Sequence, residues 1–551
     1  MKILILGGYG IFGGRLAHLL ADCPSLEILI GGRDPAKATG FCQGWTGTAK
    51  IRPIACDRAT IARALAAETP DLLVDTSGPF QSYGTDPYGV IKACLAARVP
   101  YLDLADGADF VAGVPSFDTE AKAAGIFILS GVSSFPVLTA AVIAEAAKTM
   151  TPAKVTAGIA PSPHAIVGMN VLRAILGYAG GEVALIRDGK PAMAHGLTET
   201  RRYTIAPPGK LPLNNTLFSL VDVPDLRSIP AAMPEVKTLW VGAGPTPEVL
   251  HRALILLARL RAALRLPPFT RLAPLCQTAL TRLRHGEHRG GMFVEIEGTT
   301  DAIPVTRSWH LLAEGEDGPL IPSMACEALI RRCLNGDPPQ PGARSGIGAL
   351  SLADYDALFR SRTITTGWRD TPSGPLYRRI LGTAFDRLPP SLQRLHQPGA
   401  QAQWSGLASV QRGTSRLAAL ISRLFGFPGA GDVAVTVTFR TDAKGRETWT
   451  RNFSSRLMVS TQEPGTRRNT HLITERFGPF AFGLALVLDG AVLRLIPRRW
   501  TLFGLPLPRA LMPQGDSYET ERDGKFRFHV EIALPLIGPV VTYDGWLDPA
   551  G

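Results

Sequence analysis

The stretch Lys2-Ile3-Leu4-Ile5-Leu6-Gly7-Gly8-Tyr9-Gly10-Ile11-Phe12-Gly13-Gly14 places a glycine-rich turn directly after a short apolar strand and before an amphipathic helix. In the GxGxxG register of a dinucleotide-binding fingerprint, the three glycines are Gly8, Gly10 and Gly13. We expect Gly8 to make the tight turn, Gly10 to let the backbone approach a pyrophosphate, and Gly13 to let the helix pack on the strand. The free amides at the helix N-terminus would attract the phosphate charge. This stretch therefore predicts the pyrophosphate corner of a nucleotide site.

The second apolar strand, Leu26-Glu27-Ile28-Leu29-Ile30, runs into Gly31-Gly32-Arg33-Asp34 and indicates which dinucleotide binds. NAD-specific folds usually place an acid at this strand end for the ribose hydroxyls, whereas Arg33 offers a cation that pairs with a 2′-phosphate. The sequence favours NADP as the cofactor and leaves NAD open. The alternative is that Arg33 is a surface arginine beside Asp34 and Lys37.

Apolar strands alternate with helical patterns across residues 1–133. Strands are expected near residues 3–6, 27–31, 51–55, 71–75, 100–104 and 126–130, and helices near 13–22, 58–68, 86–97 and 117–124. This alternation predicts an α/β protein whose N-terminal Rossmann domain is a doubly wound parallel sheet. Ligands bind at the carboxyl ends of the strands in such a sheet, so the loops that follow the strands are where chemistry is expected.

Those loops carry small and acidic side chains. Asp57, after the third strand, can accept a hydrogen bond from the adenine amino group or can cap the helix that follows. The turn Thr76-Ser77-Gly78, after the fourth strand, leaves room for a nicotinamide, and Phe80 can close over that space. The residues predicted to contact the cofactor are Gly8, Tyr9, Gly10, Ile11, Phe12, Gly13, Arg33, Asp57, Thr76, Ser77, Gly78 and Phe80.

Three residues near the ends of the fourth and fifth strands are candidate proton donors: Tyr83, Asp103 and Asp106. Each can instead have a structural role. No Tyr-x-x-x-Lys pair lies at the position that a short-chain dehydrogenase needs, and the sequence lacks the Gly-x-Ser-x-Gly elbow of hydrolases and the HExxH zinc motif. The seven cysteines contain no CxxC pair, which indicates reduced thiols and no metal site.

Several spaced motifs together resemble the saccharopine dehydrogenase-like oxidoreductases over residues 1 to about 140. The motifs are GGYGIFGG, GGR after the second strand, GPFQSYG, YLDLADG and SGVSSFP. The resemblance implies a Rossmann domain that binds NADP(H), a following α+β domain with substrate contacts, and hydride transfer to or from a C–N or carbonyl group of a small molecule. Two loops differ from the family pattern, at Asp106-Gly107 and at Val132–Pro136. The alternative is therefore a catalytically inactive NADP-binding sensor or interaction protein whose C-terminal domain binds lipid or a partner.

The remainder of the chain divides at proline- and glycine-rich joints, residues 335–348 and 366–375. We expect an α+β substrate or cover domain over 134–365, of which parts of 318–362 pack back on the Rossmann domain. Helices are expected at 137–149, 248–266 and 322–334, and 376–426 has a helical pattern. Period-two alternation over 433–440, 447–453 and 526–533 predicts a β-rich antiparallel domain, a curved sheet or partial barrel, over 375–551.

This tail resembles a bacterial domain of unknown function that follows saccharopine dehydrogenase-like domains. The resemblance rests on LYRRILGTAFDRLP, ERFGPFAFG, PRRWTLFGLPLPRAL and FHVEIALPLIGPVVTYDGWL, between Leu376 and Leu547. Its aromatic residues either line an apolar ligand cup or form an ordinary core. They are Phe477, Phe480, Phe482, Trp500 and Trp546.

The length of 551 residues predicts two or three domains, and the formal net charge is +11. A basic chain can bind nucleic acid, but no zinc finger, RNA-binding signature or long Lys/Arg run is present, so no nucleic-acid partner is expected. Residues 250–266 place arginines around a leucine stripe, too short to span a bilayer, and either pack on the domain or lie on a membrane. The expected location is the cytoplasm. Two further possibilities stay open: peripheral membrane contact through 250–266 or the basic tail, and a homodimer.

Overall fold

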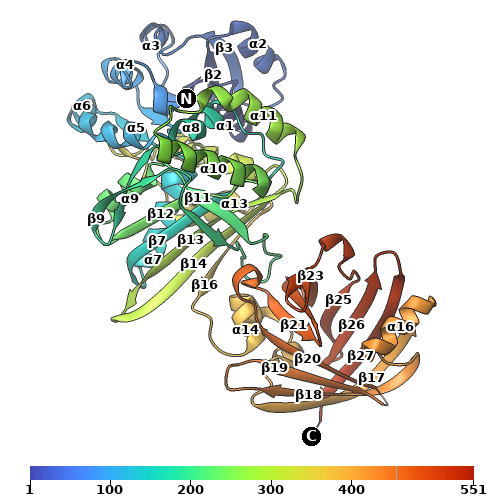
Figure 1. Ribbon diagram of the computed structural model, residues 1–551. Helices are drawn as coiled ribbons and strands as arrows, with labels where there is room; N and C mark the ends of the chain where they lie inside the picture. The colour runs from blue at the N-terminus through green and yellow to red at the C-terminus, as the bar shows by residue number, and fades with distance from the viewer. Residues whose placement is uncertain (455, 551) are drawn as a thin grey trace. The chain divides into compact units, whose positions relative to one another are not determined.

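The computed structural model describes residues 1–454 and 456–550. By contacts the chain divides into two compact units, one of Met1–Tyr203 with Thr216–Thr366 and one of Thr204–Asn215 with Gly367–Gly551. The first unit contains a parallel sheet and a mixed sheet, and the second contains an antiparallel sheet (Figure 1). The predicted α/β class with these three parts is confirmed.

The N-terminal sheet has seven strands in the order β15-β6-β5-β4-β1-β2-β3, and the described pairings are parallel. Its strands are β1 (Lys2–Leu6), β2 (Glu27–Gly32), β3 (Lys50–Ala55), β4 (Leu72–Asp75), β5 (Tyr101–Asp103), β6 (Phe127–Ser130) and β15 (Gly342–Ser345). The helices between them are α1 (Ile11–Leu19), α2 (Pro35–Gln43), α3 (Ile61–Glu68), α4 (Gly89–Ala97), α5 (Ala108–Gly113) and α6 (Asp118–Ala124). The central strands are largely apolar because helices cover both faces of such a sheet, and β4 and β5 each end in a buried aspartate, Asp75 and Asp103.

A segment far along the chain returns to this sheet. Helix α12 (Ile321–Leu334) packs on α1, and β15 pairs with the edge of the sheet beside β6 before α13 (Leu352–Phe359). The Ser323 hydroxyl donates to the carbonyl oxygen of Phe12 at 3.2 Å, and Arg331 Nη2 donates to the carbonyl oxygen of Leu19 at 2.9 Å. Helix α12 therefore holds α1 near both of its ends.

The second sheet of this unit is mixed, in the order β10-β11-β12-β7-β13-β14-β16. Its strands are β7 (Thr151–Ala160), β10 (Thr200–Tyr203), β11 (Thr216–Leu220), β12 (Thr238–Ala243), β13 (Arg289–Thr300), β14 (Ile303–Glu314) and β16 (Ile364–Asp370). Strands β8 (Glu182–Arg187) and β9 (Lys190–His195) form a separate hairpin. Strands β7 and β12 run parallel, whereas β7 and β13 run antiparallel.

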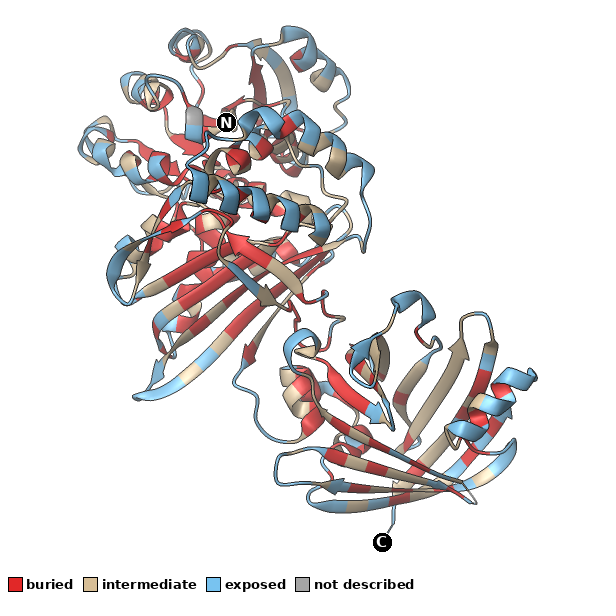
Figure 2. Cartoon of the chain, in the orientation of Figure 1, coloured by how far each residue is buried: buried red, intermediate tan, exposed pale blue. Residues whose placement is uncertain are grey.

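Helices cover this sheet: α7 (Thr139–Ala147), α8 (Met169–Tyr178), α9 (Asp225–Ala232), α10 (Glu248–Leu264) and α11 (Ala273–Arg282). A small apolar cluster joins three of them. Leu172 and Leu176 of α8 pack there with Leu254 of α10 and with Ala273 and Leu280 of α11. The other faces of α10 and α11 are largely exposed (Figure 2).

The second unit is an antiparallel β-barrel. Its sheet runs β22-β21-β20-β19-β18-β17-β27-β26-β25-β23-β24, and an additional pairing of β22 with β23 closes the ring. The strands are β17 (Gln401–Arg412), β18 (Gly431–Thr441), β19 (Glu447–Phe453), β20 (Arg456–Pro464), β21 (Ile473–Phe477), β22 (Phe480–Asp489), β23 (Val492–Leu502), β24 (Leu505–Pro506), β25 (Ser517–Arg522), β26 (Lys525–Leu534) and β27 (Gly538–Pro549). Its helices are α14 (Leu376–Leu381), α15 (Pro390–Leu395) and α16 (Arg416–Leu424).

The prediction of helix across residues 376–426 is wrong in its middle. Residues 401–412 form strand β17, which pairs with β18 and β27. The strand buries Trp404, Ala408 and Val410, which lie at even-numbered positions. The serines and the glycine between these residues weaken the alternation of apolar and polar side chains that predicts a strand. The helical patterns on either side therefore led to a prediction of helix. Pairing with two neighbouring strands overrides that local preference.

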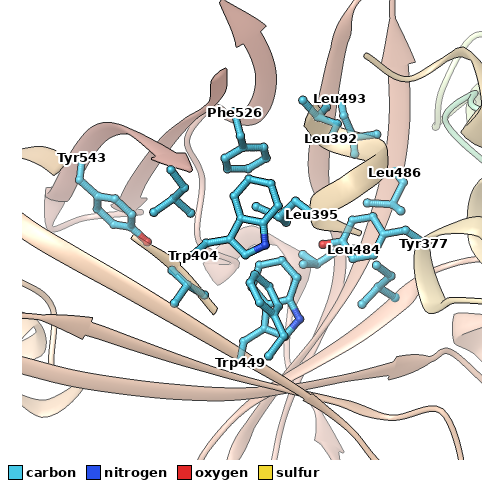
Figure 3. Close-up of a cluster of buried hydrophobic side chains, with 14 of the residues drawn as sticks. Tyr377, Leu392, Leu395, Trp404, Trp449, Leu484, Leu486, Leu493, Phe526 and Tyr543 are labelled. Atoms are coloured by element: carbon cyan, nitrogen blue, oxygen red, sulfur yellow. The ribbon is translucent and has the colours of Figure 1, made fainter. Parts of the chain in front are cut away.

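The core of the barrel unit joins helices to strands. Tyr377 of α14 and Leu392 of α15 pack with Trp404, Trp449 and the neighbouring residues drawn in Figure 3. The ring of Tyr377 stacks on His396 at a centroid distance of 3.5 Å. The helical segment that precedes the barrel is thus part of its hydrophobic core.

The aromatic residues proposed for a ligand cup divide into two places. Phe477, Phe480, Phe482 and Trp500 form one partly buried cluster on β21, β22 and β23, with centroids about 6 Å apart. Trp546 lies on β27, with the Lys525 ammonium 4.2 Å from the centroid of its ring. The apolar ligand cup therefore remains a hypothesis for this cluster of four residues and does not include Trp546.

Candidate nucleotide site and the adjoining cavity

The turn between β1 and α1 is built from glycines. Gly7 takes a left-handed φ of +83°, and the amides of Gly7 and Gly8 both donate to the carbonyl oxygen of Gly31, at 2.8 and 3.0 Å. The positive φ therefore falls one residue before the glycine expected to make the turn. Gly8 is needed for space, because a Cβ there would stand 2.9 Å from the carbonyl oxygen of Ile5.

The other two fingerprint glycines have different constraints. A Cβ on Gly13 would meet the carbonyl oxygen of Gly7 at 2.6 Å and Thr76 Oγ1 at 2.7 Å, so α1 packs on the turn only with glycine there. Gly10 is the N-cap of α1, with φ −73° and ψ 176°, and no side chain caps this helix end. The first amides of α1 are thus left for a ligand, and the N-terminal charge of a helix favours an anion. This cradle fits the pyrophosphate of a dinucleotide.

Residues around the end of β2 form the side of the site expected for the adenosine. The ring of Tyr9 packs where a Cβ on Gly32 would stand, 2.1 Å away, and its hydroxyl accepts from the amide of Asp34 at 3.1 Å. Arg33 is exposed, and its charge helps to lower the pKa of the Asp57 carboxyl. Asp57 Oδ1 accepts from the amide and hydroxyl of Thr60, both at 2.9 Å, so its carboxylate already serves the start of α3. The exposed cation at this edge fits a 2′-phosphate.

Arg33→Ala is expected to weaken NADPH binding about tenfold and to leave NADH binding unchanged, because only NADPH carries the 2′-phosphate that an arginine pairs with. Fluorescence titration with both nucleotides measures the two dissociation constants. Lys37→Ala is the matched control, since Lys37 is an exposed cation in the first turn of α2 that pairs with Asp34 at 3.5 Å. Equal losses for NADPH and NADH in Arg33→Ala would refute the assignment.

The turn after β4 is fixed by local hydrogen bonds. Thr76 Oγ1 donates to the carbonyl oxygen of Leu6 at 2.9 Å, and the Ser77 hydroxyl donates to Asp75 Oδ1 at 2.7 Å. Asn170 Nδ2 of α8 donates to the carbonyl oxygen of Gly78 at 2.6 Å. The predicted nicotinamide turn is therefore tied both to β1 and to the helix that covers the mixed sheet.

Two aromatic residues of this region lie in the core. Phe80 is 6% exposed and stacks on Tyr83 at a centroid distance of 4.8 Å. The Tyr83 hydroxyl donates to Asp75 Oδ2, burial raises the pKa of Tyr83, and the Arg58 guanidinium lies 3.4 Å from the centre of its ring. Phe80 therefore packs beneath the turn that was expected to hold the nicotinamide, and the Tyr83 hydroxyl is engaged by a buried carboxylate.

Asp103 is completely buried at the end of β5. Its Oδ1 accepts from the amide of Gly131 at 2.7 Å, from the amide of Ala105 at 2.9 Å and from the Ser130 hydroxyl at 3.0 Å. Burial raises the pKa of Asp103 to about 7, although these three donors oppose the shift. The carboxyl joins β5 to the turn after β6, which is a structural use of this candidate donor.

A cavity of about 480 Å³ adjoins the nucleotide corner within the first unit. Phe12 and Arg15 of α1 form one wall, and the other walls come from α8, α10, α11 and the ends of β7, β11, β12 and β13. Most of the lining side chains are apolar, which is typical of a small-molecule site of this size. Because Phe12 belongs both to the predicted cofactor corner and to the cavity wall, the cavity begins where the nucleotide is expected to end.

Three ionisable groups gather beside this cavity. Tyr178, the last residue of α8, lines it. Burial raises the pKa of Tyr178, and the charges of Asp106 and Asp222 raise it further. Burial also raises the pKa of Asp106, which has a hydrogen bond with Gln81, and raises the pKa of Asp222 to about 6. Asp222 Oδ1 is buried without a hydrogen-bond partner in the described structure. Raised carboxyl pKa values beside a cavity are typical of acid–base sites.

A second polar pair faces the same cavity. His251 Nε2 of α10 lies 2.7 Å from the Ser219 hydroxyl of β11, and both residues line the cavity. Burial lowers the pKa of His251 to about 4, so its ring is neutral near pH 7. The pair can orient a polar substrate group by hydrogen bonds.

The sequence analysis did not single out Tyr178, Asp222, Ser219 or His251. Tyr178 ends an apolar helix, and Asp222 follows a short strand, so neither is close in sequence to a recognised motif. The fold brings Tyr178 and Asp222 close to Asp106. Of the three proton donors predicted from the sequence, Asp106 is the one that lies with them. The remaining predicted donors, Tyr83 and Asp103, are engaged elsewhere.

Comparison with known proteins supports the nucleotide site of the N-terminal domain. A family model described as the saccharopine dehydrogenase NADP binding domain matches residues 3–129, and one described as a domain of unknown function (DUF4166) matches residues 388–547. The predictions of a saccharopine dehydrogenase-like oxidoreductase domain and of NADP as its cofactor are confirmed at this level. The comparison with curated proteins finds no match.

Among solved structures, the saccharopine dehydrogenase (L-Glu forming) of Saccharomyces cerevisiae is similar over 67% of this chain and 99% of that chain, at 14% identity and a TM-score of 0.46. The amine dehydrogenase of Mycobacterium smegmatis is similar over 62% of this chain and 94% of that chain, at 12% identity and a TM-score of 0.32. These values are too low to transfer a substrate or a reaction. Residues 3–129 thus match the saccharopine dehydrogenase NADP binding domain, and residues 388–547 match a domain of unknown function.

Proposed function

We propose that the protein is an NADP-dependent oxidoreductase that acts on a C–N or carbonyl group of a largely apolar small molecule held in the cavity. The observation that carries this proposal is the shared wall: Phe12 belongs to the helix start that fits the pyrophosphate and also lines the apolar cavity. A substrate in the cavity would thus lie beside the cofactor.

NADP(H), when bound, supplies or accepts the hydride. The chain's own residues position the reactants and handle the proton. Tyr178 stays neutral because its pKa is raised, so its hydroxyl donates a hydrogen bond to a carbonyl oxygen or imine nitrogen at the cavity wall. A proton that leaves Tyr178 is replaced from Asp222 or Asp106, whose protonated forms persist to higher pH than in a solvated aspartate. The apolar walls exclude water from the reacting groups.

The proposal predicts a pH dependence of reduction. Burial raises the pKa of Asp222 from 3.8 to about 6; the charge of Arg227 opposes this shift, and the charges of Asp109 and Asp106 add to it. The protonated carboxyl of Asp222, which can donate a proton, therefore predominates below about pH 6 and is lost as the pH rises. The rate of reduction should fall between about pH 5 and pH 8. Asp222→Asn should lower the rate and flatten the profile. A wild-type profile that stays level between pH 5 and pH 8 would contradict this role.

Substrate-dependent oxidation of NADPH tests the proposed function. The probes are a long-chain methyl ketone alone, the same ketone with methylamine to form the imine, and a short ketone as the comparison. Steady turnover that increases with chain length supports an apolar substrate. Tight NADPH binding without turnover of any probe would favour instead the inactive NADP-binding sensor.

A further inference from the structure

The segment that roofs the cavity has an unusual charge pattern. Between residues 249 and 286 every charged side chain is an arginine, and no acidic residue occurs. These arginines are Arg252, Arg259, Arg261, Arg265, Arg271, Arg282 and Arg284. A cationic segment of this kind is attracted to a surface of anionic lipid.

Helix α10 presents a leucine stripe to solvent. Val249, Leu256, Leu260 and Leu264 are 77%, 59%, 44% and 65% exposed, and their spacing of seven, four and four residues places them on one face. The opposite face, which includes Ile255, is buried against the domain. The stripe is therefore not part of the packing that holds the helix in place.

Helix α11 and the turns around it extend this surface. Leu275 is 68% exposed, and Leu272 and Leu283 are exposed as well. The inner face of α11 is used for packing, since Cys276 and Leu280 belong to the apolar cluster with α8. Both helices thus have a packed inner face and an unpartnered apolar outer face.

The arginines border this apolar surface. Arg252 and Arg259 follow Val249 and Leu256 by three residues, which places them at one edge of the stripe. Arg252 also pairs with Glu248 at 2.7 Å, at the start of the same helix. Arg265, Arg271, Arg282 and Arg284 are exposed, and in the part of the chain that the structure describes no ion pair joins them to an acid. Arg261 has a different use, because its guanidinium donates to the carbonyl oxygens of Gly177 and Ala179 at 2.7 and 2.6 Å.

The cavity reaches the same surface. Leu257 of α10 and Ile166 line the cavity and are also exposed, by 36% and 59%. An apolar path therefore leads from the outer face of α10 to the neighbourhood of Tyr178. No helix in the described residues is long and apolar enough to cross a membrane, so contact with a bilayer would be made at its surface.

We propose that the outer face of α10 and α11 docks on an anionic lipid bilayer, and that the cavity receives its substrate from that bilayer. The leucine stripe enters the boundary of the acyl chains while the bordering arginines contact lipid phosphates. Docking is inferred only from the exposed leucine and arginine side chains and does not depend on the proposed function. The delivery of substrate rests on the proposed function.

Vesicle flotation of the full chain tests the docking. The wild type is expected to float with vesicles that contain phosphatidylglycerol and about tenfold less with pure phosphatidylcholine, and salt should weaken the binding. Leu256→Ser/Leu260→Ser/Leu264→Ser should reduce flotation about tenfold, since these residues do not line the cavity. The matched control is Leu417→Ser/Leu420→Ser/Leu424→Ser, which removes the exposed leucines of α16 in the other unit.

Two results would overturn the docking proposal. One is equal flotation of the wild type with anionic and neutral vesicles, and the other is a loss of binding in the α16 variant with full binding in the α10 variant. Turnover of a detergent-dispersed long-chain ketone is measured in parallel. Turnover without docking overturns only this inference, whereas docking without turnover overturns the proposed function and with it the delivery of substrate.

Discussion

Gly10→Val is expected to weaken NADPH binding about 100-fold or more, equivalent to about 3 kcal/mol. The backbone of Gly10, with φ −73° and ψ 176°, is one that valine adopts readily. Its Cβ would stand 2.9 Å from the carbonyl oxygen of Gly7, so the turn must shift to admit it, and circular dichroism checks that the variant is folded. The rest of the side chain would stand over the amides of α1, where the pyrophosphate is expected. Calorimetric titration with NADPH measures the loss.

The matched control for this substitution is Gly40→Val. Gly40 lies in α2, and no heavy atom stands within 4 Å of a Cβ placed on it. Its variant should bind NADPH like the wild type and have a similar melting temperature. Wild-type affinity in Gly10→Val would show that the nucleotide does not lie on this corner.

Tyr178→Phe is expected to lower kcat for reduction about 100- to 1,000-fold, within the range that a positioned proton donor contributes. The substitution removes only the hydroxyl, so the dissociation constants of NADPH and of a long-chain ketone should change little. Stopped-flow measurement of NADPH oxidation separates the chemical step from binding.

Tyr355→Phe is the control for this second substitution. Tyr355 is buried in the same unit, and within the described structure its hydroxyl has no hydrogen-bond partner. Its variant should keep full turnover. A Tyr178→Phe variant as fast as the wild type would remove Tyr178 from the reaction and leave the Ser219–His251 pair as the polar group to test.

The nucleotide corner could be predicted from sequence because its requirements are local. A turn that brings α1 onto β1 needs glycine where a Cβ would strike backbone, and Gly8 and Gly13 meet that need within a few residues. The sequence predicted the tight turn at Gly8, whereas the residue with the left-handed backbone conformation is Gly7. Spacing fixes which residues form the turn, but the exact dihedral angles depend on how the strand ends.

The loop after β4 shows the limit of arguing from strand ends alone. Phe80 and Tyr83 follow a strand of the parallel sheet, which favoured the ligand crevice. In the structure they stack on each other and contact Phe110 at tilted and edge-on angles, because a buried aromatic cluster removes more apolar surface from water than an open loop does. Residues that follow a strand can turn inward, and sequence position does not distinguish the two directions.

The cavity could not be predicted because no single segment encodes it. Its walls join α1 to helices more than 150 residues later, and its ionisable group combines Tyr178 with Asp106 and Asp222. The leucine stripe of 250–266 was expected only to pack on the domain or to lie on a membrane, and its inner residues line the cavity while its outer residues stay exposed. An amphipathic helix with leucines on two faces indicates two contacts, and packing on the domain accounts for only one.

A crystal structure with NADP⁺ and a long-chain ketone bound tests the central claim most directly. The account predicts the pyrophosphate on the amides at the start of α1, the nicotinamide at the cavity wall beside Phe12, and the ketone oxygen within hydrogen-bond distance of the Tyr178 hydroxyl. A nicotinamide turned away from the cavity, or a ketone bound elsewhere in the chain, would contradict it.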